Sequence, residues 1–249
     1  MDRLIGDGKY KIINILSADE GYEAALCMDV LVNNDYATYV VNIYKSKDLI
    51  RSYLPMYYDM DRERCREFRE LIAAQGRVMA VFAYHEGEEL FAFFRKHPKD
   101  AYEEKLEYAD ALLSAALELD IQDDAIAACA LAGGVTVQPK NRRIGFNYIV
   151  SPEVTVDEGF RTQALGKMMR AIFPPYRYLP VEIDDFIDEL LRKGGRMTTC
   201  VEAYSEWRAL QEEADKTYKK YLKESWIKYL IRRAKRKREK RKRARNTDA

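Results

Sequence analysis

Residues 134–148 read GVTVQPKNRRIGFNY, and this stretch decides between the possible architectures of the chain. Apolar and β-branched residues lie on either side of Pro139-Lys140-Asn141, a combination typical of a short β-hairpin. Gly133-Gly134 comes directly before it and ends a helix that we predict over residues 121–132. A lone hairpin inside a helical half of the chain predicts an α+β protein rather than a helical bundle.

The N-terminal part of the chain carries most of the strand signals. Ile-, Val- and Tyr-rich runs predict strands, and Asn33-Asn34 before Asp35 indicates a hairpin turn. Between them, DMDRERCREFRELIAAQ predicts a charged helix with Gly76 as its C-cap. The predicted strands cover 9–16, 22–32, 36–45, 77–86 and 89–95, and the predicted helix covers 59–75.

The remaining part of the chain is predominantly helical. Leu106, Leu112, Leu113 and Leu117 share one side of a predicted helix, with further helices on both sides of the hairpin. The last helix is predicted to begin near Thr198 and to run into the basic tail. The predicted helices are 100–119, 121–132, 156–172, 181–192 and 198 onward, and the predicted domains are 1–97, 98–215 and 216–249.

The charges are divided very unevenly along the chain, although the formal net charge of the 249 residues is only +1. Residues 228–245 contain twelve Lys or Arg and one acid, Glu239, which gives a local charge of +11 and leaves −10 on the rest. The chain starts without a signal-peptide pattern and has no run of about 18 apolar residues. The four cysteines show no CxxC spacing. We therefore expect a cytoplasmic protein, peripheral to the inner face of a membrane if the tail binds lipid.

The order of these elements resembles the protein kinase fold over roughly residues 8–215. The resemblance implies an α+β, two-lobed structure with a five-stranded antiparallel N-lobe. Its C-lobe would be reduced and helical, with one β-hairpin and a long basic C-terminal helix. The PVEIDDFIDELLRKGGRMTTCVEAYSEWRALQEE segment looks like the last two helices of such a lobe.

The nucleotide-binding positions implied by this resemblance are altered in the N-lobe. The glycine-rich loop would lie at 16–22, where a single glycine follows Asp19 and Glu20; we interpret it as an acidic hairpin turn. Val41-Asn42-Ile43-Tyr44-Lys45 resembles the segment that carries the phosphate-binding lysine. Lys45 would pair with Glu63 or Glu67 on the predicted helix 59–75, and such a pair can equally be a structural strut.

The positions implied for the C-lobe are also degenerate. The metal-binding aspartate of kinases falls at Asn147 and the following phenylalanine at Tyr148, while the catalytic loop falls within residues 126–131. Phosphoryl transfer depends on bound magnesium and on an acid that orients the nucleophile, and neither acid is present here. We therefore expect a catalytically inactive pseudokinase with no cofactor and no metal. Asp120, Asp123 and Asp124 are predicted to cap the nearby helix.

A reduced bacterial pseudokinase of this type is similar to the cytoplasmic domain of the EssB/YukC family of type VII secretion systems. That family carries a membrane segment after its pseudokinase-like domain. The present chain departs from the pattern because a basic helix takes that place. The resemblance implies a scaffold in a secretion or membrane-associated assembly.

The basic tail has three open interpretations. It is a solvated terminus, an anchor for an anionic membrane, or a site for nucleic acid or an acidic protein. In the second interpretation, the residues at the lipid interface are Trp226, Ile227, Tyr229, Leu230 and Ile231. A neighbouring copy of the acidic body could also bind it, which would give a homo-oligomer. The candidate anion-binding residues are Arg232, Arg233, Lys235, Arg236, Lys237, Arg238, Lys240, Arg241, Lys242 and Arg243.

Three functions follow from these features. The first is a non-catalytic scaffold that binds protein partners. The second is an atypical nucleotide-binding kinase that uses Lys45 with Asp123 or Asp124 as its acid. The third is a nucleic-acid-binding protein in which the tail is the functional element. Nucleotide binding that depends on Lys45, or duplex binding that depends on the tail, would distinguish them.

Overall fold

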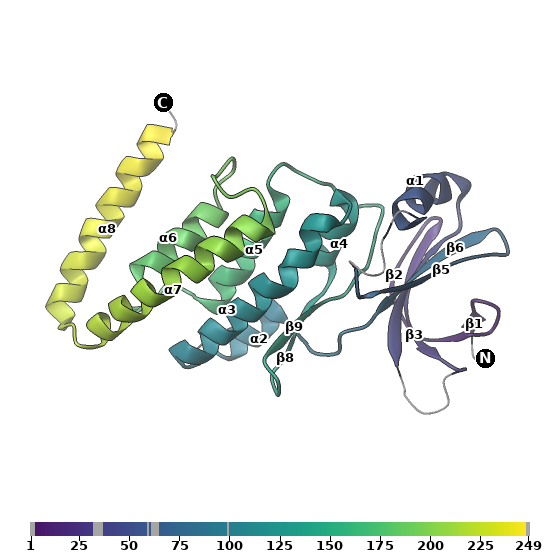
Figure 1. The fold of residues 1–249 in the computed structure, drawn as a ribbon, viewed down its shortest axis with the longest axis horizontal. Helices are drawn as coiled ribbons and strands as arrows, with labels where there is room; N and C mark the ends of the chain where they lie inside the picture. Colours follow the sequence, from purple (N-terminus) through teal and green to yellow (C-terminus); the bar gives the residue numbers. More distant parts are fainter. Residues whose placement is uncertain (1–2, 32–36, 59, 61–64, 99, 248–249) are drawn as a thin grey trace.

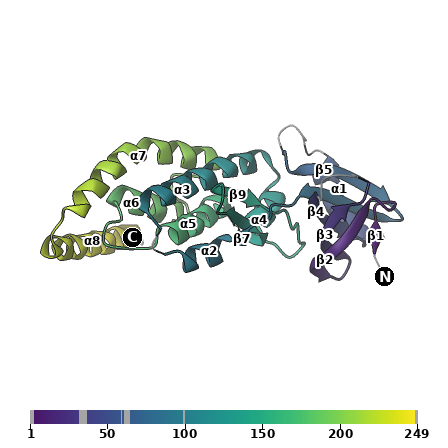
Figure 2. The same ribbon diagram turned by 90° about the horizontal axis from the view of Figure 1, so that it is seen from below.

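The computed structural model describes residues 3–31, 37–58, 60, 65–98 and 100–247. The chain forms an elongated molecule, with a curled β-sheet at one end and a group of helices at the other (Figure 1). The same two parts are separated along the long axis after rotation (Figure 2). No helix in the described ranges is long and apolar enough to cross a lipid bilayer.

The N-terminal sheet is antiparallel throughout and has the strand order β1-β2-β3-β4-β6-β5. Lys9, directly before β2, and Tyr10 on β2 both bond to Glu70 on β5, so side chains connect β2 to the edge strand β5 across the curled sheet. Helix α1 lies beside the sheet (Figure 1). The elements are β1 (Leu4–Ile5), β2 (Tyr10–Asp19), β3 (Tyr22–Asp29), β4 (Thr38–Tyr44), α1 (Lys47–Tyr58), β5 (Phe68–Ala74) and β6 (Arg77–Ala83).

The C-terminal part packs helices around a small three-stranded sheet of order β7-β8-β9. The predicted hairpin at 135–150 is confirmed, with Val135 opposite Phe146. The elements are β7 (Glu88–Glu89), α2 (Leu90–Lys96), α3 (Tyr102–Ala116), η1 (Leu117–Ile121), α4 (Asp124–Gly133), β8 (Val135–Gln138), β9 (Arg143–Phe146), α5 (Phe160–Ile172), α6 (Val181–Leu190), α7 (Cys200–Leu222) and α8 (Trp226–Thr247).

The two faces of the N-terminal sheet are buried differently. The inner face, with Tyr22, Tyr44 and Phe82, belongs to one core that continues through the helices to Trp207. The outer face holds a separate, smaller cluster that includes Ile43. Because side chains alternate across a strand, the face on which a residue lies decides whether it can reach the C-terminal part.

Three sequence predictions about these elements are wrong. The predicted helix 59–75 is not formed over its second half, because Phe68–Ala74 is strand β5, paired with β6. The predicted strand 89–95 is instead helix α2, whose first N–H groups donate to the side chain of Glu89. The large sheet has six strands in place of the expected five, because β5 replaces the strand expected at 89–95 and β1 adds one more.

The single long C-terminal helix is the third of these errors. Helix α7 ends at Leu222, and a separate helix, α8, begins at Trp226. Helix α8 lies beside the helical part (Figure 1). A capping box between Thr199 and Glu202 starts α7, close to the predicted start at Thr198. The break matters for function because it returns the basic segment toward the body of the protein.

Candidate functional site between sheet and helices

Asn147 lies just after β9 and fixes the segment that joins the sheet to the helices. Its Oδ1 accepts a hydrogen bond of 2.7 Å from the backbone N–H of His85, and its Nδ2 donates to the carbonyl of His85 at 3.1 Å. Thr136 Oγ1 donates to the same carbonyl at 3.1 Å. An amide can donate and accept at once, whereas an aspartate accepts only. Asn147 therefore serves here as a strut between the two parts of the molecule.

The connecting segment also lies very close to the β8–β9 hairpin. A Cβ atom at Gly145 would be 2.4 Å from Cγ of His85, and one at Gly87 would be 2.5 Å from the carbonyl oxygen of Val137. Both distances are too short for a real contact, so these positions require glycine. In this close arrangement, the backbone N–H and carbonyl of His85 both make hydrogen bonds within the protein.

Asn42 connects the inner face of the sheet to the residues that follow Asn147. Its side chain is completely buried, and its Oδ1 accepts from the hydroxyl of Tyr22 and from the backbone N–H of Val150, both at 2.8 Å. Its Nδ2 donates to the carbonyl of Tyr148 at 2.8 Å. The amide therefore makes three of its four possible hydrogen bonds, two of them across the junction and one to Tyr22 within the sheet.

Aromatic side chains fill the space on both sides of this bridge. Tyr148 stacks on Phe82 with ring centroids 4.8 Å apart, and its hydroxyl accepts from Nε2 of Gln122 at 2.9 Å. Burial raises the pKa of Tyr148 well above its ordinary value, so the phenol is neutral. Tyr44 donates to the carbonyl of Val150 at 2.9 Å. The junction is a layer of neutral polar and aromatic groups.

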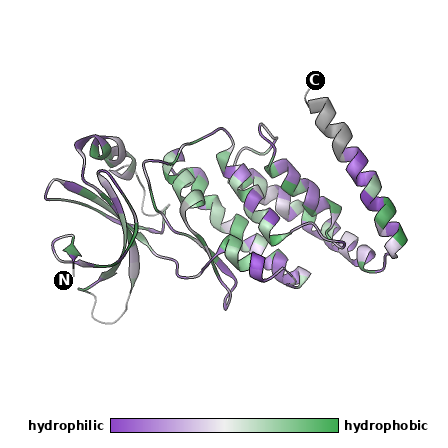
Figure 3. Ribbon diagram, turned by 180° about the vertical axis from the view of Figure 1, so that it is seen from behind, coloured by the Kyte–Doolittle hydropathy of each residue, from purple (hydrophilic) through white to green (hydrophobic). Residues whose placement is uncertain are grey.

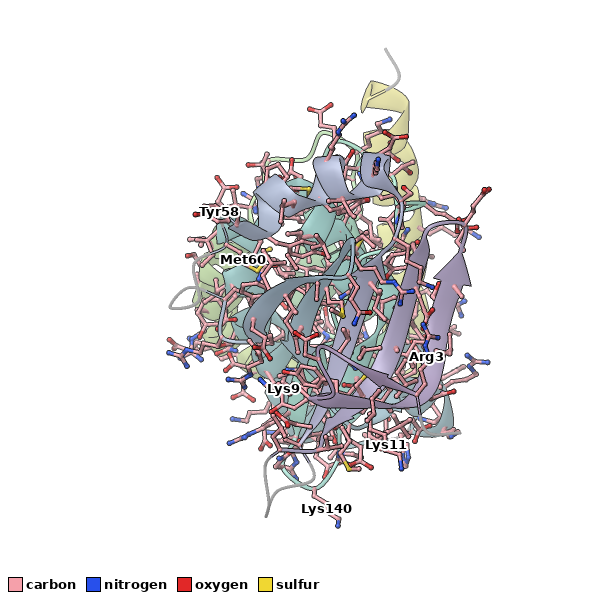
Figure 4. All side chains as sticks on the ribbon, turned by 90° about the vertical axis from the view of Figure 1, so that its right-hand side faces the viewer. Arg3, Lys9, Lys11, Tyr58, Met60 and Lys140 are labelled. Carbon is pink, nitrogen blue, oxygen red and sulfur yellow. The ribbon has the colours of Figure 1, made fainter. Side chains whose placement is uncertain are left out.

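Lys45 lies away from this junction. Ile43 belongs to the outer cluster and Tyr44 to the inner core, so alternation places Lys45 on the outer face. Its Nζ is 2.5 Å from Oε2 of Glu23, which Arg3 also bonds; Arg3 is labelled on the outer face in Figure 4. Burial opposes ionisation of Glu23, but its bonds to Lys45 and Arg3 prevail and lower its pKa.

The two glutamates proposed as partners of Lys45 have different outcomes. Glu63 lies outside the described residues. Glu67 precedes β5, and its Oε1 is 3.3 Å from Nε2 of His85. The bond to His85 lowers the pKa of Glu67, while burial and the bond with Glu67 raise the pKa of Glu118 to about 7. Glu67 thus belongs to a second contact region, where it pairs with His85 and raises the pKa of the neighbouring Glu118.

The acids close to the predicted catalytic loop have structural roles. Asp123 caps α4 through the N–H of Ala125, which confirms its predicted role. Asp124 lies 2.7 Å from Arg161. Asp120 accepts from the N–H groups of Cys200 and Val201 and therefore caps α7, not the helix predicted. Residues 126–131 lie within α4 and are buried.

No acidic side chain occurs anywhere between residues 125 and 152 in the sequence. Consistent with this, the described residues contain no cluster of three or more His, Cys, Asp or Glu that could hold a metal ion. The turn at Glu20-Gly21 joins β2 directly to β3, which confirms the interpretation of 16–22 as an acidic hairpin turn.

The basic residues of α8 divide between a docked side and an exposed side. Arg232 bonds to Glu224 and to the carbonyl of Arg177, and Arg236 bonds to Asp184 and Asp185 on α6. The remaining candidates up to Arg238 are exposed, namely Arg233, Lys235, Lys237 and Arg238. The side chains of Lys240, Arg241, Lys242 and Arg243 lie outside the described set. A cavity of about 780 Å³ lies between α8 and residues 175–184.

Comparison of the fold with solved structures identifies protein kinase domains. The PknI kinase domain of Mycobacterium tuberculosis aligns with 12% identity and a TM-score of 0.50, over 81% of this chain and 96% of that chain. A double mutant of that domain gives 13% identity and a TM-score of 0.52, over 81% of this chain and 95% of that chain. Rad53 residues 1–466 in complex with AMP-PNP align with 12% identity and a TM-score of 0.55, over 81% of this chain and 66% of that chain.

No protein-family model and no curated protein sequence matches the chain. Identities this low establish the fold alone. The chain therefore has a protein kinase-like α+β fold with a curled antiparallel sheet, as the order of its elements indicated.

Sequence reasoning missed several residues of the junction. Asn42 was noted only as part of the segment before Lys45, and Tyr44, Phe82, His85 and Gln122 were not singled out. Alternation along β4 was the available signal, because it places Asn42 and Tyr44 on the same face and Lys45 on the other.

Proposed function

We propose that this protein is a catalytically inactive pseudokinase that acts as a cytoplasmic scaffold for protein partners. The observation that carries the proposal is the bonding of residues 148–150 to the inner face of the sheet by Asn42 and Tyr44. A nucleotide between the lobes would have to displace Tyr148 and break these buried hydrogen bonds. Each bond left unsatisfied would cost about 1–3 kcal/mol.

The charges near the junction support the same proposal. Magnesium prefers carboxylate ligands, and Asn147 offers an amide that is already bonded to His85. Lys45, the candidate for phosphate binding, is paired with Glu23 on the opposite face of the sheet. Asp123 and Asp124 are occupied as a helix cap and as a partner of Arg161. These contacts weigh against an atypical kinase that uses the same residues.

The scaffold has a physical basis in its rigid junction. The buried contacts around Asn42 and Asn147 fix the two parts relative to one another, so the outer surfaces are presented in one arrangement. On the strength of the EssB/YukC resemblance, we extend the proposal to a bacterial type VII secretion or other membrane-associated assembly. Nucleic-acid binding by the tail is the competing outcome that the experiments below distinguish.

Thermal unfolding with and without magnesium and ATP tests the proposal. We expect no saturable change in Tm for the full chain, and none for Lys45→Ala beyond its own change in stability. A saturable, magnesium-dependent rise in Tm that Lys45→Ala abolishes would contradict the proposal and favour the atypical kinase. Lys47→Ala, an exposed lysine two residues away, is the matched control.

A further inference from the structure

The start of α8 exposes an apolar surface that contacts with the body do not explain. Ile227 is 70% exposed, Ile231 is 64% exposed and Trp226 is 58% exposed; Leu230 is also exposed. The spacing of Ile227, Leu230 and Ile231 by three and four residues places them on one face of the helix. We call the exposed residues Trp226, Ile227, Leu230 and Ile231 the apolar tip.

A different face of α8 makes the contacts with the body. Tyr229, Arg232 and Arg236 repeat at helical spacing and are the half-buried residues of the described part of the helix. Arg232 lies 3.6 Å from the ring centroid of Tyr221, and Arg236 bonds to Asp184. With this face held against the body, Ile227, Leu230 and Ile231 are directed toward solvent. Trp226 lies at the border of the two faces, with Arg177 of the body 5.4 Å from its ring centroid.

Cations surround the apolar tip. Lys228, Lys235 and Arg238 are exposed beside or after it, and Glu239 is the single acid of residues 228–245. Figure 3 shows hydrophobic residues at the start of α8 among hydrophilic ones. An apolar group bordered by cations matches a lipid surface with anionic headgroups, where apolar side chains enter the interface and cations meet phosphates.

The position of the apolar tip fits a flat partner. The turn between α7 and α8 lies at the end of the molecule opposite the N-terminal sheet (Figures 1 and 2). Two copies paired through this face would bring together two segments with a charge of +11 each, which disfavours dimerisation there. Nucleic-acid phosphates would complement the cations but would leave the isoleucines in water.

We propose that the apolar tip and its surrounding cations dock this protein on an anionic lipid surface, with the N-terminal sheet directed away from it. The docking does not depend on whether a nucleotide binds between the lobes. An experiment can therefore contradict the docking without contradicting the pseudokinase proposal, and the reverse. Binding requires both components, because exposed cations alone give weak, salt-sensitive attraction and the apolar residues supply the insertion.

Tryptophan fluorescence of the full chain reports the docking directly. The chain has two tryptophans; Trp207 is completely buried, so a change in emission on adding vesicles comes from Trp226. We expect a blue shift with vesicles of phosphatidylcholine and phosphatidylserine, and none with phosphatidylcholine alone. Trp226→Phe should abolish the shift while sedimentation with the mixed vesicles persists.

Two pairs of variants separate the components. Ile227→Ser with Ile231→Ser should lower the vesicle affinity about tenfold or more, whereas Ile121→Ser with Val201→Ser, at residues 52% and 53% exposed elsewhere, should not. Lys235→Glu should lower it about tenfold, and Lys140→Glu on the hairpin should leave it unchanged.

Three results would overturn the proposal. They are equal binding to neutral and anionic vesicles, full binding by the double isoleucine variant, and binding of duplex DNA or RNA in place of vesicles. Circular dichroism confirms folding of each variant; the exposed positions make unfolding unexpected.

Discussion

The junction between the sheet and the helices differs in chemistry from the contact between α8 and the body. The junction is buried and is made by neutral groups, the amides of Asn42 and Asn147 and the phenol of Tyr148. The α8 contact is partly exposed and is made by ion pairs of Arg232 and Arg236. Neutral buried hydrogen bonds keep their strength in salt, whereas partly exposed ion pairs are screened.

Because of this difference, the two regions should differ in how easily they open. The junction is part of the continuous core, so opening it requires disruption of the fold. None of the described residues of α8 belongs to that core, and salt or a competing anion can weaken the contacts of the helix. The protein thus combines a fixed body with a terminal helix whose docking depends on its ionic environment.

Replacing Asn42 with Leu should break the junction and have the largest effect. The substitution removes three hydrogen bonds and leaves the Tyr22 hydroxyl, the Val150 N–H and the Tyr148 carbonyl buried without their partner. We expect a loss of about 3 kcal/mol in the free energy of unfolding, measured by urea denaturation. Asn14→Leu, at an exposed position on β2, is the control and should change stability by less than about 0.5 kcal/mol.

The same experiment in high salt sharpens the comparison. The deficit of Asn42→Leu relative to the parent protein should be independent of sodium chloride concentration, because no ion pair is lost. A deficit that disappears in salt would show that charge, rather than neutral hydrogen bonding, holds the junction.

The fold class followed from the sequence because the hairpin at 134–148 and the order of the elements are local signals. The error at 59–75 arose because apolar residues at helical spacing were given more weight than Gln75-Gly76. Both residues have positive φ, at 53° and 71°, and form the tight turn between β5 and β6. The turn was interpreted as a helix end.

The strand predicted at 89–95 failed for a related reason. Its aromatic residues favoured a strand, but Leu90, Phe93 and Phe94 have the i, i+3, i+4 spacing of a helix and are all buried. Helix α1 is not among the predicted elements, and Pro55 lies inside it. Packing of Tyr57 in the core outweighs the lost backbone hydrogen bond.

The site could be predicted only in part. The absence of acids around Asn147 is visible in the sequence, but its bonds to His85 depend on a contact between residues 62 positions apart. The pairing of Lys45 with Glu23 similarly depends on the register of β3 and β4. Such long-range contacts are fixed by tertiary structure, and a single sequence carries no local signal for them.

Glu118→Gln should test the ionisable groups around Glu67 and have an intermediate effect. The pKa of Glu118 is raised to about 7 in the folded protein, so the folded state binds more protons than the unfolded state between its ordinary pKa and pH 7. Stability therefore falls as pH rises through this window. Glu67, Arg66 and His85 face the same carboxyl.

We expect Glu118→Gln to raise the free energy of unfolding at pH 8 by about 1 kcal/mol, a value reduced for solvent screening, and to have little effect at pH 5. Thermal denaturation between these pH values measures the difference. Glu107→Gln, an exposed partner of Arg142, is the control and should show no such pH-dependent gain. A gain of equal size at both pH values would contradict a raised pKa at Glu118.

Arg236→Met should weaken the α8 contact with the smallest effect on global stability. The change removes the bonds to Asp184 and Asp185 but leaves the core intact, so we expect a loss below about 1 kcal/mol. Hydrogen exchange in α8 should nevertheless accelerate, and high salt should accelerate it in the parent protein as well. Lys235→Met, one residue away and exposed, should leave the exchange unchanged. Equal exchange in both variants would mean that the apolar and cation–π contacts near Tyr221, rather than the ion pairs, hold the helix.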